Sequence, residues 1–249
     1  LSPGKTYTFS SGSTYTLTGS LSADGTCATP TQIFSSSLGS AATISKSSNA
    51  VSVNYIRLRD ITATGGAVFT ANNCTNFGNN NGWTINTPDS YGLYWIGNGG
   101  NWNDPNHWSF TSGGVTSGCI PTPYNNVYFD GNSFSGGGQS VSVDQVSYCK
   151  SMNWTGAIAS STLTGGSSLN VYGSLILNST MNVTYTGQIT FKSNNPGNNI
   201  QTFGKALSSH IYLDALGGEW TLQDDLNLPG NNIYLVTGSL NTNGQTVNM

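Results

Sequence analysis

The ten acidic side chains are the residues of this 249-residue chain best suited to catalysis. A glycoside hydrolase needs two carboxyl groups about 5–10 Å apart across a cleft. Asp224 and Asp225 are adjacent, so on a strand they would point to opposite faces, and in a turn they are more typical of solvated turn residues. A lyase needs a basic residue beside acidic groups, and Lys192 and Asp214 lie one repeat apart with nothing else gathered around them. Because no catalytic motif occurs either, we expect no enzymatic activity.

Two loops carry side chains suited to calcium, which prefers carboxylate and amide oxygens. Alternatively, Asn and Asp side chains cap their own turns by accepting nearby backbone N–H bonds. The sequence leaves both interpretations open. The candidate ligands are Asn103, Asp104, Asp130 and Asn132.

Three tryptophans, Trp95, Trp102 and Trp108, lie close together in the chain. Exposed indoles would form a platform for stacking on glycans, which is the alternative of a carbohydrate-binding module. Packed indoles would instead fill the join between structural units, each burying about 150–250 Å². Because several exposed tryptophans are costly, the cluster favours packing.

The four cysteines are Cys27, Cys74, Cys119 and Cys149. None forms a CxxC pair, and only two histidines are present, so a structural zinc site is not expected. An even count in a chain rich in Ser, Thr and Asn indicates extracytoplasmic disulfides. We expect the local pairing, Cys27–Cys74 with Cys119–Cys149; four free buried thiols are the alternative.

The composition predicts an all-β protein. Charged residues make up 7% of the chain, 32 residues are glycine, and the apolar residues are mainly aromatic or β-branched, which suits strands joined by tight turns. The net charge is −3 without a Lys/Arg cluster, so we expect no nucleic-acid partner. No apolar stretch reaches the length of a membrane-spanning helix, and we expect no membrane insertion.

Apolar pairs recur at a nearly fixed spacing in the C-terminal third. The pairs are Leu169/Val171, Ile189/Phe191, Ile211/Leu213 and Ile233/Leu235. The interval from one pair to the next, roughly 20–22 residues, is the size of one coil of a β-helix, which buries its apolar face only by stacking on neighbouring coils. The sequence therefore predicts an elongated right-handed parallel β-helix, or β-solenoid, rather than a β-sandwich.

The remaining chain divides by composition. We expect N-terminal coils over residues 1–88, a Trp-rich junction segment over 89–160 and C-terminal coils over 161–249. Two T-x-T pairs, Thr6/Thr8 and Thr14/Thr16, raise the possibility of an ice-binding face. However, they are less than one coil apart, and no matching threonine columns are evident in the C-terminal coils.

The Trp-rich segment resembles a known repeat. The strings YWIGNGGNWNDPNHWS (94–109) and IPTPYNNVYFDGNSFSG (120–136) are similar to a repeat of very large secreted adhesins of Bacteroidota, including gliding-motility adhesins exported by type IX secretion. The resemblance implies a β-helical segment of a long surface filament, without enzymatic activity. It also implies that the matching positions are framework residues: Trp95, Trp102, Asp104, Trp108, Pro121, Asp130 and Phe134.

Together these features predict a structural and adhesive repeat unit of an extracellular, cell-surface filament. Its expected partners are neighbouring repeats or copies of itself, end to end, and surface polysaccharide. Because the chain starts at Leu1 and its last coil stops part-way, we expect a segment excised from a longer protein. A carbohydrate-binding module is the alternative, followed by a polysaccharide-degrading β-helix enzyme.

Overall fold

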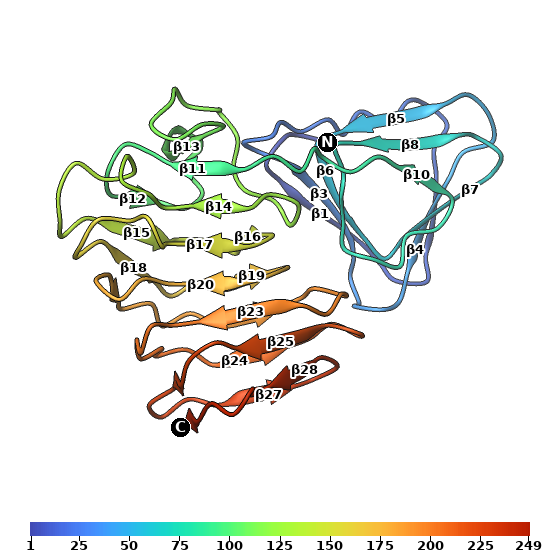
Figure 1. Cartoon of the computed structure of the whole chain (residues 1–249). Helices are drawn as coiled ribbons and strands as arrows, with labels where there is room; N and C mark the ends of the chain where they lie inside the picture. Colours follow the sequence, from blue (N-terminus) through green and yellow to red (C-terminus); the bar gives the residue numbers. More distant parts are fainter. The chain divides into compact units, whose positions relative to one another are not determined.

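The computed structural model describes all 249 residues, which form two compact units, Leu1–Asp89 and Ser90–Met249. Each unit is a β-solenoid, in which the strands of one coil pair in parallel with those of the next (Figure 1). The only helical element is one 3₁₀ turn, η1 (Pro105–His107). The division between the units lies one residue beyond the predicted boundary after residue 88, whereas the predicted boundary after residue 160 falls inside the second unit.

The first unit has four coils and three sheets, because each complete coil contributes three strands. Its first face is β1 (Thr6–Phe9), β3 (Thr31–Ser35), β6 (Ile56–Arg59) and β9 (Thr75–Asn76). Its second face is β2 (Thr14–Thr16), β4 (Ala42–Ser45) and β7 (Ile61–Thr64). Its third face is β5 (Val51–Asn54), β8 (Phe69–Asn72) and β10 (Trp83–Ile85).

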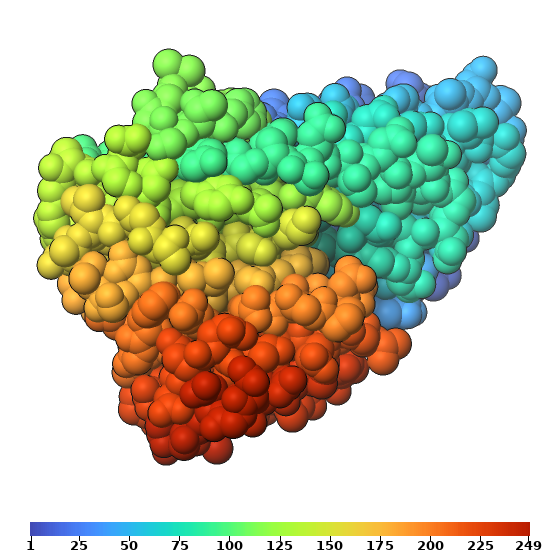
Figure 2. Space-filling model, in the orientation of Figure 1, coloured from blue at the N-terminus to red at the C-terminus, as the bar shows by residue number.

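The second unit has seven coils, which follow one another in Figure 2 as bands from green to red. Its first face is β13 (Trp108–Ser109), β11 (Leu93–Trp95), β14 (Val127–Tyr128), β17 (Met152–Asn153), β20 (Leu175–Ile176), β23 (Asn198–Gln201), β25 (Glu219–Leu222) and β28 (Ser239–Asn241). Its second face is β12 (Gly100–Asn101), β15 (Ser140–Val143), β18 (Thr162–Gly165) and β21 (Asn182–Val183). Its third face is β16 (Ser147–Cys149), β19 (Leu169–Val171), β22 (Ile189–Phe191), β24 (Ile211–Leu213) and β27 (Ile233–Leu235). Later coils add the two-stranded sheet β26 (Leu226–Asn227) and β29 (Val247–Asn248).

The pairing register confirms the repeat predicted from the apolar pairs. Leu169 pairs with Ile189, Ile189 with Ile211, and Ile211 with Ile233, each on the next strand of the third face. The first three residues of this column are buried, as are their partners two positions on. Burying such a side chain stabilises the fold by about 1.5–3 kcal/mol, so the stacked columns are its main source of stability.

The Trp-rich segment supplies the first coils of the second unit. Strand β11 pairs in parallel with β14, and β14 pairs in parallel with β17. On its other side β11 pairs antiparallel with β13, which follows the 3₁₀ turn. The outer edge of β11 is therefore covered by the chain itself.

Candidate functional site

The acidic side chains hold neighbouring coils together instead of converging on a cleft. Six of the ten bond to a group on an adjacent coil, and five of those six accept from a backbone N–H there. No group of three or more His, Cys, Asp or Glu side chains comes together in a way that would hold a metal ion. The six are Asp24, Asp60, Asp144, Asp214, Asp224 and Asp225.

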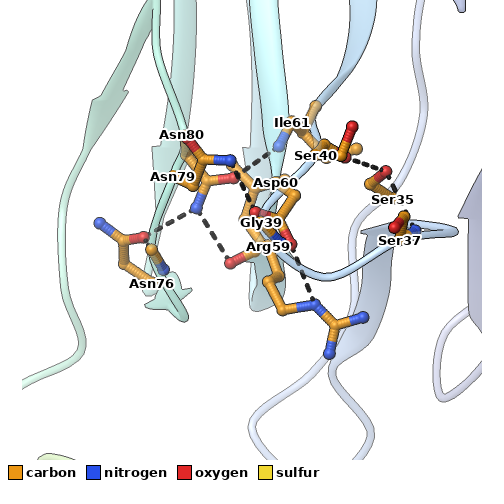
Figure 3. A network of polar contacts seen from close by, with 12 residues as sticks. Ser35, Ser37, Gly39, Ser40, Arg59, Asp60, Ile61, Asn76, Asn79 and Asn80 are labelled. Carbon is orange, nitrogen blue, oxygen red and sulfur yellow. Dashed lines mark hydrogen bonds and ion pairs between the residues drawn. The ribbon is translucent and has the colours of Figure 1, made fainter. Parts of the chain in front are cut away.

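Asp60 shows this arrangement most completely (Figure 3). Its side chain is buried, and its backbone is left-handed, with φ of 57°. One carboxylate oxygen accepts from the N–H of Gly39 on the preceding coil at 3.2 Å. The other accepts from Nδ2 of Asn79 on the following coil at 2.7 Å, and Arg59 Nε lies 3.5 Å from the carboxylate. One side chain thus connects three successive coils.

The neutral side chain of Asn80 also bonds to backbone groups of a neighbouring coil. Asn80 accepts from the N–H of Ile61 at 2.9 Å, and its Nδ2 donates to the carbonyl of Leu58 at 3.0 Å. The same Nδ2 lies 2.7 Å from Oδ1 of Asn76 (Figure 3). Because buried backbone groups at the corners of a coil lack strand partners, these amides satisfy them.

The adjacent carboxylates of Asp224 and Asp225 bond to different coils. Asp224 accepts from the N–H groups of Thr202, at 2.9 Å, and Phe203, both on the preceding coil. Asp225 accepts from the N–H of Thr246 on the following coil at 2.7 Å. Asp224 is half-buried and accepts from two backbone donors, whereas Asp225 is exposed directly after a bend, as expected of a solvated turn residue, and accepts from one.

The pair Lys192 and Asp214 forms an ion pair at 3.0 Å between adjacent coils. Both side chains are about one-third exposed. An exposed ion pair of this kind stabilises a protein by roughly 0–1 kcal/mol, so its contribution is small. It lies outside any cluster of three acidic, histidine or cysteine side chains.

The three clustered tryptophans, Trp95, Trp102 and Trp108, are fully buried. Trp95 and Trp102 each meet Trp108 edge to face, with ring centroids 5.1 Å apart. Phe129 packs beside all three and stacks on Trp154 at 3.8 Å. No indole face is left to stack on a sugar. The predicted burial is confirmed, but the tryptophans lie in the core of the second unit, and no role at a join between units is shown.

The histidine of the same segment also belongs to this cluster. The ring of His107 stacks on Trp95 with centroids 4.7 Å apart and an interplanar angle of 2°. Its Nδ1 lies 2.8 Å from the carbonyl oxygen of Ile96. Both contacts fix the 3₁₀ turn onto the core of the first coil.

Two of the four calcium candidates, Asp104 and Asp130, make the turn-capping bonds of the alternative interpretation. Asp104 accepts from the N–H of Asn106, and Asp130 accepts from the N–H of Asn132, each at 2.9 Å. Asn103 donates to Asp144 and Ser147 through its side-chain amide. Calcium binding at these loops stays a prediction, which a chelator-induced fall in melting temperature would support.

The cysteine pairing predicted from the sequence is wrong. Cys27 and Cys119 are disulfide-bonded, whereas Cys74 and Cys149 are free and buried. Cys149 pairs in register with Val171, so it occupies an inward position of the third face. The sequence held this signal, since Cys149 lies one repeat before Val171 along the same apolar column.

The last coil of the second unit exposes apolar side chains. Leu235 pairs with the fully buried Leu213 in the same inward column, yet it is 60% exposed. Val236 and Met249 are 54% and 71% exposed. Strand β27 has a partner on one side only, so its other edge offers unpaired backbone groups.

No helix of the protein is long and apolar enough to cross a bilayer. Comparisons with known proteins identify no relative: no family model matches the chain, and no curated protein or solved structure is significantly similar to it.

Proposed function

We propose that the chain is a non-catalytic structural unit of a long extracellular surface filament, with an adhesive role. The observation that carries this proposal is the use of the carboxylates. Six of the ten bond between coils, as Asp60, Asp224 and Asp225 do. A chain with few titratable groups that commits most of its acids to coil stacking is suited to bearing load.

Further features support the extracellular location and the filament. The disulfide-bonded cysteines, Cys27 and Cys119, are typical of secreted proteins. The open edge of β27 and the exposed Leu235 would be covered by one more coil, whether from a neighbouring repeat or from a copy of the chain. The resemblance of residues 94–109 to Bacteroidota adhesin repeats agrees with this role.

Antibodies against the folded chain test the proposal on the cells that produce it. Immunogold labelling is expected to decorate filaments at the cell surface, and Fab fragments are expected to reduce attachment of the cells to surfaces. Labelling confined to the cell interior would contradict the proposal. So would cleavage of a polysaccharide by the purified chain that is lost on replacing one of its carboxylates.

A further inference from the structure

The second face of the first unit carries a regular array of hydroxyl groups. Strand β2 pairs in register with β4, and β4 with β7. Their inward residues include Ile44 and Ala63, which are buried, so the alternate residues point outward. Those outward residues form two columns across three coils, Thr14, Thr43 and Thr62 beside Thr16, Ser45 and Thr64.

This threonine face (Thr14, Thr16, Thr43, Ser45, Thr62 and Thr64) was hidden in the sequence by uneven coil lengths. In the first column, the chain segment from Thr14 to Thr43 is much longer than the segment from Thr43 to Thr62. No fixed spacing links them, so only the strand register reveals the columns. The T-x-T pair Thr14/Thr16 has partners one coil away, whereas Thr6/Thr8 lies on another face of the same coil, in agreement with their short spacing in the sequence.

The hydroxyls of the threonine face are available for a ligand. All six side chains are exposed or half-buried, and no hydroxyl among them has a hydrogen-bond partner within the protein. Strands β2, β4 and β7 carry no charged residue. The other two faces of this unit differ. The first presents Arg59, and on the third a single hydroxyl column (Ser52, Thr70 and Thr84) lies beside asparagines, of which Asn72 and Asn86 bond to each other through their amides.

The second face of the second unit has a matching array. Ser140 pairs with Thr162, and Ser142 pairs with Thr164, on strands β15 and β18. Asn182 continues the first column on β21. All five side chains are exposed or half-buried, and the hydroxyl pairs join strand β15, in the 89–160 segment, to strand β18, in the C-terminal coils.

The spacing of these hydroxyls is close to that of ordered water. Strands of neighbouring coils lie about 4.7–4.9 Å apart, and alternate residues of one strand about 6.6 Å apart. In a tetrahedral network of water, hydrogen bonds join oxygens about 2.7–2.8 Å apart, which places second-neighbour oxygens about 4.5 Å apart within a layer. Perpendicular to that layer, the oxygen pattern repeats about every 7.3 Å. Over three coils, the difference between the strand spacing and the oxygen spacing of about 4.5 Å accumulates to only about 0.6 Å along the stack.

From this geometry we infer that the two hydroxyl faces bind the surface of ice. Threonine suits this ligand because its β-branched side chain is stiff, so its hydroxyl and methyl groups are held in place with little loss of entropy on binding. An uncharged face also complements an uncharged lattice. A crystalline polysaccharide is disfavoured, because sugar sites use aromatic platforms and several kinds of polar group, and the outward side chains of β2, β4 and β7 are only threonine and serine. The inference does not depend on the filament role.

Ice-affinity partitioning of the intact chain tests this inference, with a non-binding protein as the reference. Slow growth of ice from a dilute solution is expected to enrich the wild-type chain in the solid phase. Each of the variants Thr43→Tyr and Thr164→Tyr is expected to reduce the enrichment, and the double variant is expected to lose it. Tyrosine retains strand propensity but places a bulky ring in the array.

The matched control is Thr70→Tyr, which alters a half-buried outward threonine on the third face of the first unit. It is expected to partition like the wild type, and circular dichroism checks that every variant is folded. Exclusion of the wild type from ice, or unchanged partitioning of the folded double variant, would overturn the inference. Co-sedimentation with crystalline cellulose or chitin without entry into ice would show a polysaccharide ligand and would overturn it as well.

Discussion

Asp224 and Asp225 are neighbours in the chain, yet their carboxylates bond in opposite directions along the stack. Asp224 accepts from Thr202 on the coil before it, and Asp225 accepts from Thr246 on the coil after it. Two adjacent residues thus join three coils, and both carboxylates accept hydrogen bonds from backbone N–H groups.

Because they engage different coils, the two residues are expected to act independently. Asp224→Ala leaves the part-buried N–H of Thr202 without its partner and is expected to lower the free energy of unfolding by about 1–3 kcal/mol. Asp225→Ala removes an exposed hydrogen bond and is expected to cost about 0.5–1.5 kcal/mol. The double variant is expected to show the sum of the two losses within about 0.5 kcal/mol. Urea denaturation of the four proteins measures this, and a strongly non-additive double variant would show that the two carboxylates share a partner.

Asp60→Ala is expected to be costly, because Asp60 is buried and joins three coils. Its removal leaves the N–H of Gly39 and the amide of Asn79 without their acceptor, which is expected to cost about 2–4 kcal/mol in total. The left-handed backbone at Asp60 adds strain for alanine. The control is Glu219→Gln on the outward side of β25, which is expected to change stability by less than about 0.5 kcal/mol. Equal effects of the two substitutions on the urea midpoint would contradict this assignment.

Trp102→Ala tests the buried aromatic cluster. Removing a fully buried indole is expected to lower the free energy of unfolding by about 3–5 kcal/mol, through lost burial and the cavity left beside Trp108 and Phe129. Thermal and urea unfolding measure the loss. Tyr234→Ala, on a ring that is 38% exposed, is the control and is expected to cost far less. A mild effect at Trp102 together with a folded core would mean that the cluster does not anchor the first coil.

The free thiol of Cys74 is expected to make stability depend on alkaline pH. Burial raises the pKa of this thiol from 9.0 to about 12, although a hydrogen bond to the backbone of Leu58 opposes the shift. Since the folded state holds the proton more tightly, this contribution is fully present below pH 9 and is lost as the pH rises toward about 12. Cys74→Ala removes it, so the variant is expected to lose less stability than the wild type between pH 9 and 11.

A thiol reagent provides a second measurement on the same residue. Cys74 and Cys149 are buried, so neither is expected to react in the native protein at neutral pH, and both are expected to react after unfolding in denaturant. Rapid labelling of the native chain would show that its core opens readily. Parallel alkaline loss of stability in the wild type and Cys74→Ala would assign the pH dependence to other groups.

The parts of the fold that repeat evenly could be predicted from the sequence. Leu169, Ile189 and Ile211 recur at nearly constant intervals, so their columns, and with them the solenoid, followed from spacing alone. Burial of the Trp cluster followed from the cost of exposing several indoles.

The uneven parts could not be predicted in the same way. The coils of the first unit differ in length, so the pairing of Thr14 with Thr43 depends on where each turn lies. The number of residues between two threonines does not reveal the positions of the turns. The disulfide-bonded cysteines were missed for a different reason. Local pairing ignores which face of a strand a cysteine occupies, and Cys149 points into the core.

The carboxylates that hold the coils together accept mainly from neutral N–H groups, as those of Asp60 and Asp225 do. Dissolved salt weakens interactions between charges but has little effect on hydrogen bonds of this kind or on buried apolar columns. The stability of the fold is therefore expected to depend only weakly on the screening of charges, and to change little between low and moderate ionic strength.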